Sequence, residues 1–114
     1  MAGYEPPIIE GSTITPLKYR LLLDTGSYCD WASGTIQILD KNQVALSTFA
    51  TPVAVTVSGT GNMFLDWYPV WGTSAGQLPN ITVEGVFYAR WRGVQTTTTR
   101  DKYTEPVEFR IKPR

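Results

Sequence analysis

Two aromatic segments, each carrying a tryptophan, flank a loop rich in turn-forming residues, and they constrain the fold more than any other feature. The first is Gly61–Trp67, which reads Gly-Asn-Met-Phe-Leu-Asp-Trp, and the second is Gly85–Arg92, which reads Gly-Val-Phe-Tyr-Ala-Arg-Trp-Arg. In both, bulky side chains recur at every second position, the spacing that places them on one face of a strand. Gly, Ser, Thr, Pro and Asn between the segments favour turns. The pair therefore predicts two strands of an antiparallel β domain.

The same period-two pattern recurs along most of the chain, and no window has helical spacing. Further strands are expected over residues 17–23, 34–39, 44–46, 53–57 and 107–112. A turn is expected at Arg92–Val94, after which residues 95–99 would pair back as an edge ribbon. About seven short strands separated by turn signals predict an all-β fold, a single Ig-like antiparallel β-sandwich. The Cys…Trp…Cys framework of antibody domains is missing.

The length of the chain fits one domain. A chain of 114 residues is long enough to bury a core of its own. Residues 1–10 contain two consecutive prolines and precede any periodic segment, so they are expected to be an extended N-terminal arm. Such an arm either packs on a neighbouring molecule or frays. Residues 11–114 are expected to form the sandwich.

The charge balance limits the classes of partner. Ten basic and ten acidic residues give a net charge of zero, which provides no long-range attraction to nucleic acid or to an anionic membrane. Weak self-repulsion permits close packing between protein copies. No apolar run approaches the roughly 20 residues that cross a bilayer, and Met1–Pro7 lacks the features of a signal peptide. We therefore expect a soluble protein, made in the cytoplasm, that binds neither nucleic acid nor membrane.

The sequence predicts no metal or cofactor. Cys29 is the single cysteine and the chain has no histidine, so neither an internal disulfide nor a Cys–His pair can form. The aspartates lack the spacing of a calcium loop, and no glycine-rich phosphate loop occurs. Cys29 is expected to be a small buried apolar residue.

One motif offers an enzymatic alternative. Leu21–Ser27 reads Leu-Leu-Leu-Asp-Thr-Gly-Ser and resembles the active-site motif of aspartic proteases, in which two aspartates share a proton. A single copy would require a homodimer of the retroviral type, with Asp24 as the catalytic residue. The glycine-rich flap of that family is missing from 45–55, and Glu84 stands where an apolar residue is expected. Asp-Thr-Gly-Ser is also ordinary turn chemistry between two strands.

The four tryptophans allow a carbohydrate-binding or adhesin module as a second alternative. At least two of them should lie in the core, because they alternate with apolar neighbours. Trp71, in the loop beside Gly72, is expected to be the exposed one. Exposed aromatic residues also mark protein interfaces, which is the interpretation we favour.

Several stretches in order resemble small Ig-like domains of tailed-phage structural proteins, above all the N-terminal domain of phage upper baseplate proteins. They are a polar start leading into a strand, the turn that follows it, the opening of the next strand, and the two aromatic segments: residues 10–13, 24–26, 30–36, 61–67 and 85–91. Trp31 replaces the usual aliphatic residue, and the gap between Trp67 and Gly85 is long. The docking contacts of that family are therefore not carried over.

The resemblance implies a non-enzymatic structural or adaptor protein of a virion, located in the tail, baseplate, connector or capsid surface. Its partners would be other virion proteins and copies of itself, with several copies in a symmetric assembly. Contacts are expected from the arm and from the loop after the first aromatic segment: Tyr4, Pro6, Pro7, Ile8, Tyr68, Trp71 and Leu78. Strand pairing at residues 95–99 is a further expected docking mode.

Overall fold

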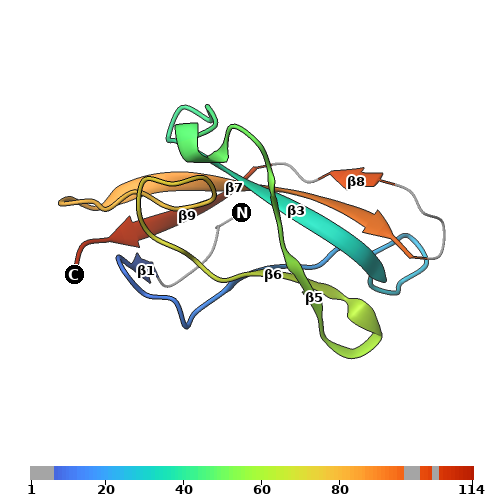
Figure 1. Cartoon of the computed structure of the whole chain (residues 1–114). Helices are drawn as coiled ribbons and strands as arrows, with labels where there is room; N and C mark the ends of the chain where they lie inside the picture. The colour runs from blue at the N-terminus through green and yellow to red at the C-terminus, as the bar shows by residue number, and fades with distance from the viewer. Residues whose placement is uncertain (1–6, 97–100, 104–105) are drawn as a thin grey trace.

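The chain folds into two packed β-sheets. The computed structural model describes residues 7–96 and 106–114 and the backbone of residues 101–103 (Figure 1). The larger sheet has the strand order β1 (Ile8–Ile9), β9 (Val107–Lys112), β7 (Gly85–Gln95), β3 (Trp31–Leu39) and β4 (Val53–Ala54), and β8 (Asp101–Tyr103) also pairs with β7. The smaller sheet has the order β2 (Leu17–Tyr19), β6 (Phe64–Trp67) and β5 (Thr56–Ser58). Short 3₁₀ turns occur at Ser47–Phe49 and Thr60–Asn62, and the described residues contain no α-helix, which confirms the all-β prediction.

The antiparallel pair of β3 and β7 forms the centre of the larger sheet. Its register runs from Trp31 opposite Gln95 to Leu39 opposite Tyr88, with an irregularity between Trp31 and Ser33. The turn predicted at Arg92–Val94 is wrong, because β7 continues through these residues. The chain pairs back only later, where β8 lies antiparallel to Arg92–Val94. Residues 97–99 of the expected edge ribbon lie outside the described residues.

Three other expected strands are shorter than their sequence pattern. Of residues 17–23 only Leu17–Tyr19 is a strand, and of residues 44–46 only Ala45 makes an isolated bridge, to Leu39. The segment 53–57 is interrupted at Val55, whose amide donates to the Gly34 carbonyl at 3.0 Å. The two halves of this segment join different sheets, so the chain crosses from the larger sheet to the smaller at Val55.

The first strand makes the larger sheet mixed, which corrects the expectation of a purely antiparallel fold. β1 lies parallel to β9, with Ile8 opposite Ile111. The amide of Glu10 continues this pairing with a 2.8 Å hydrogen bond to the Lys112 carbonyl. The segment expected to be an extended arm thus contains a strand that covers the outer edge of β9.

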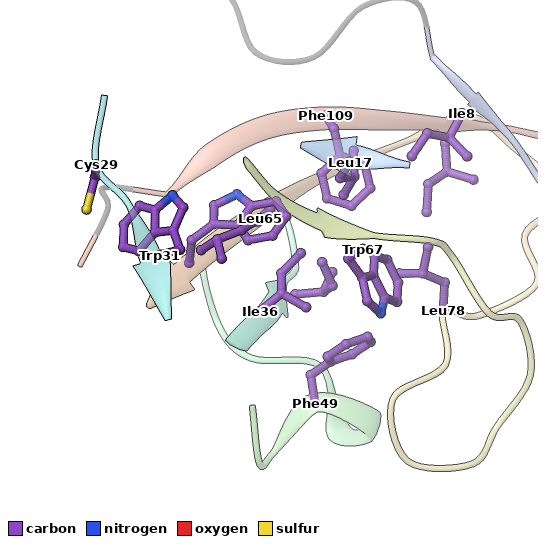
Figure 2. Packing of buried hydrophobic residues seen from close by; sticks show 14 residues of the cluster. Ile8, Leu17, Cys29, Trp31, Ile36, Phe49, Leu65, Trp67, Leu78 and Phe109 are labelled. Carbon is purple, nitrogen blue, oxygen red and sulfur yellow. The ribbon is translucent and has the colours of Figure 1, made fainter. Parts of the chain in front are cut away.

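Large apolar side chains fill the space between the two sheets (Figure 2). Three of the four tryptophans are buried there, at 1%, 5% and 1% exposure for Trp31, Trp67 and Trp91, as the alternation predicted. Aromatic rings connect the sheets: Tyr19 of β2 stacks on Trp91 of β7 with centroids 5.9 Å apart. Cys29 is fully buried, which confirms its predicted place. Burial of each such large side chain stabilises the fold by about 1.5–3 kcal/mol.

Candidate functional site

Three exposed apolar side chains lie on neighbouring segments at one end of the smaller sheet. Ile14 is 83% exposed, Tyr68 48% and Val70 46%, and we refer to these three residues as the apolar patch. Ile14 precedes β2, and the other two follow β6. Because β2 and β6 are antiparallel, with Leu17 opposite Trp67, the segments that carry the patch leave the sheet at the same end.

The alternation along β6 explains why Tyr68 points outward. Leu65 and Trp67 face the core and are buried, so the next residue lies on the opposite face. Pro69 is then fully buried, and it anchors the chain between two exposed apolar residues, Tyr68 and Val70. Sequence reasoning found Tyr68 but missed Ile14 and Val70, although Ile14 carries the simple signal of an apolar residue in a polar, turn-rich segment.

Hydrogen bonds fix the segments on both sides of the patch. The indole Nε1 of Trp71 donates to the Ser12 carbonyl at 2.8 Å, which ties the chain before β2 to the chain after β6. The Leu78 amide donates to the Val70 carbonyl at 2.6 Å, and the Gly72 amide donates to the Leu78 carbonyl at 2.9 Å. The loop after β6 is therefore closed on itself and held by its own backbone.

The residues that were expected to make contacts differ in their exposure. Tyr68 is on the patch, and Trp71, expected to be exposed, is only partly so and packs against the core. Leu78 and Ile8 are buried at 0% and 5% exposure, so neither offers a side chain to a partner of this monomer. Pro7 is half-buried. Tyr4 and Pro6 lie outside the described residues.

A polar cluster occupies the outer face of the smaller sheet beside the patch. The Lys18 Nζ lies 3.1 Å from both carboxylate oxygens of Asp66, which is the residue opposite Lys18 in the β2–β6 register. The Ser58 hydroxyl of β5 donates to Asp66 Oδ2 at 2.6 Å. Asp66 is only 5% exposed. The cluster joins all three strands of the sheet and favours their observed register.

The Asp24 motif forms an exposed turn. The Leu23 amide donates to the Ser27 carbonyl at 2.8 Å, and the Gly26 amide donates to the Leu23 carbonyl at 3.0 Å. Gly26 has φ of +90°, a conformation that favours glycine. Asp24 is exposed at the tip of this turn. This geometry agrees with the interpretation of Asp-Thr-Gly-Ser as turn chemistry.

The part of the chain that the structure describes offers no metal site and no membrane-spanning helix. Within it, no three His, Cys, Asp or Glu side chains gather as a set that could hold a metal ion. No helix among the same residues has the length and apolar character needed to cross a membrane. Comparisons with protein families, curated proteins and solved structures gave no match to this chain.

Proposed function

We propose that this chain is a non-enzymatic structural or adaptor protein of a phage particle that acts through protein–protein assembly. In this proposal its two sheets are an Ig-like sandwich variant, placed in the tail, baseplate, connector or capsid surface. The apolar patch is the observation that carries the assembly role. Single exposed apolar residues are ordinary on a protein surface, whereas several on adjacent, firmly held segments are typical of an interface.

The rigidity of the patch supports this role. Trp71 is bonded to Ser12, Pro69 is buried, and the loop after β6 is closed by hydrogen bonds at its base. A partner that binds a surface already held in place loses less conformational entropy on binding. The patch is therefore suited to a stable contact with little rearrangement.

The partners in this proposal are other virion proteins and further copies of the chain. The net charge of zero leaves little repulsion between copies. Assemblies of this kind are symmetric, so several copies in a ring are expected. Of the seven positions at which contacts were expected, Tyr68 is the one that the structure describes as strongly exposed.

The test has two parts. Mass spectrometry of gradient-purified particles should find the chain at a fixed ratio to the major capsid protein, and absence from particles would contradict the proposal. In complementation, a Tyr68→Ser, Val70→Ser double variant should enter particles at least about tenfold less than the wild type, which corresponds to about 1.4 kcal/mol of contact energy. Val83→Ser, at a residue 73% exposed but outside the patch, is the matched control and should enter normally.

A further inference from the structure

The outer face of the larger sheet carries a shallow groove over β3 and β7. One hollow of about 290 Å³ is lined by Thr35, Gln37, Pro52, Arg90, Trp91 and Arg92. A second hollow of about 360 Å³ shares Thr35 and Arg92 with the first and continues past Ala54 and Gly93. The two hollows form one groove, which lies on the face opposite the core.

Strand alternation places two arginines in this groove. Ala89, Trp91 and Gly93 of β7 are buried, so the residues between them, Arg90 and Arg92, point outward. Their Cα atoms are therefore roughly 6.5–7 Å apart along the strand. Across the ladder Arg90 is opposite Gln37 and Arg92 is opposite Thr35. The groove thus combines cations with neutral hydrogen-bonding side chains.

Arg90 is held in place by a neutral group. Its Nη2 donates to Gln37 Oε1, and the orientation of this amide is fixed because Gln37 Nε2 donates to the Phe49 carbonyl at 2.8 Å. Among the described residues no carboxylate forms an ion pair with Arg90, in contrast to Arg110 on the same face, which lies 3.6 Å from Glu84. The guanidinium is positioned while its charge is not neutralised by a carboxylate of the described chain.

We propose that this groove binds a carboxylate side chain on an acidic segment of a partner protein, with Arg90 as the principal contact. The planar guanidinium matches a carboxylate through two parallel N–H···O bonds. Arg92 lies beside Arg90 in the groove, and Thr35 supplies a hydroxyl. This site is on a different face from the apolar patch, so it goes beyond the proposed assembly contact and does not depend on it.

The groove favours an acidic peptide over a nucleic acid. Single strands bind through basic grooves in which aromatic rings stack on the bases. Among the described residues that line the groove the one aromatic, Trp91, is 1% exposed and turns its ring into the core. A chain with no net charge also lacks the general attraction that nucleic-acid binding uses.

The test is an NMR titration of the full chain, following the Arg90 Nε–H and Gln37 side-chain amide signals. The probe is a hexaglutamate peptide at moderate salt, and a hexaglutamine peptide is its neutral match. Saturable shifts at both side chains are expected with hexaglutamate alone. Arg90→Gln should weaken binding by about tenfold or more. Arg90→Lys should bind more tightly than Arg90→Gln but less tightly than the wild type, because lysine keeps the charge and cannot form the two parallel hydrogen bonds of a guanidinium. Both variants change an exposed side chain and should fold normally.

Two matched variants and a second ligand make the result decisive. Arg110→Gln removes a cation of the same face that is already paired with Glu84, and it should leave the peptide affinity unchanged. The Tyr68→Ser, Val70→Ser variant should also bind the peptide normally, so failure here is distinct from failure of the assembly proposal. Absence of shifts at Arg90, an equal loss in Arg110→Gln, or tighter binding of an oligothymidylate in this groove would each overturn the proposal.

Discussion

The ring of Trp31 occupies the space that a side chain at position 93 would need. A Cβ built on Gly93 would lie 2.3 Å from Cζ3 and 2.4 Å from Cε3 of Trp31. The opposite residue on β3, Gly34, has the same relation to Leu65, whose Cδ1 would lie 2.8 Å from a Cβ there. Two facing glycines thus make a notch in the larger sheet that Trp31 and Leu65 fill from the core side.

Gly93→Ala should therefore destabilise the fold by about 1–3 kcal/mol, the usual cost of an added methyl in a tightly packed core. Urea unfolding followed by circular dichroism measures the free energy of unfolding. Gly61→Ala is the comparison for a methyl group that meets no neighbour, because nothing lies within 4 Å of the Cβ position of Gly61. Its cost comes from the positive φ of 69° alone. In a Trp31→Leu background the penalty of Gly93→Ala should shrink. Equal penalties in both backgrounds would show that the ring is not the cause.

Removal of Lys18 should cost more stability than neutralisation of Asp66. The Lys18 side chain is 47% exposed and that of Asp66 is 7% exposed, so Lys18→Met leaves a buried carboxylate with fewer partners, whereas Asp66→Asn leaves a lysine that water can solvate. We expect a loss of about 2 kcal/mol for Lys18→Met. Arg110→Met breaks an exposed pair with Glu84 and should cost under about 1 kcal/mol. Thermal and urea unfolding of the three variants check this order, and the reverse order would contradict it.

Trp71→Phe should loosen the two segments that carry the apolar patch. It removes the 2.8 Å hydrogen bond to the Ser12 carbonyl while keeping a ring against the core. The expected loss of stability is about 1 kcal/mol. Hydrogen–deuterium exchange should be faster in peptides covering residues 10–16 and 68–78 than in the wild type. Tyr28→Phe, at an exposed ring elsewhere, serves as the control, and unchanged exchange in Trp71→Phe would refute the anchoring role.

Asp24→Asn should leave the fold and assembly intact. The side chain is exposed at the tip of a turn that backbone hydrogen bonds hold in place, so a change in stability below about 0.5 kcal/mol is expected. Incubation of the purified protein with unfolded peptides at acidic pH should give no cleavage. Cleavage that disappears in Asp24→Asn would instead establish the protease alternative and contradict the proposed function.

The strands that the sequence pattern located best are those that alternate over their whole length. Val107–Lys112 is a strand with the bounds that were expected, and Trp67 and Trp91 are buried where alternation placed them. Gly93 was assigned to a turn because glycine commonly marks one. Its real role, to leave room for Trp31, depends on a contact between residues far apart in sequence, which no local pattern contains.

Local patterns also fail where one segment serves two sheets. Residues 53–57 have an unbroken alternation, yet pairing with β3 ends at Ala54 and pairing with β6 begins at Thr56. The candidate sites show the same limit. Tyr68 is among the contacts that the sequence predicted, whereas the places of Ile14 beside it and of Gln37 opposite Arg90 depend on strand register.

The parallel pairing of β1 with β9 also determines how the domain would carry a mechanical load. Tension that pulls on the start of β1 and on the end of β9 acts in opposite directions along two strands that run the same way. The hydrogen bonds of the β1–β9 ladder are then loaded together in shear. In a hairpin that is pulled open from one end, by contrast, the bonds break one after another. A domain anchored through these two strands would resist stretching until the whole β1–β9 ladder slides.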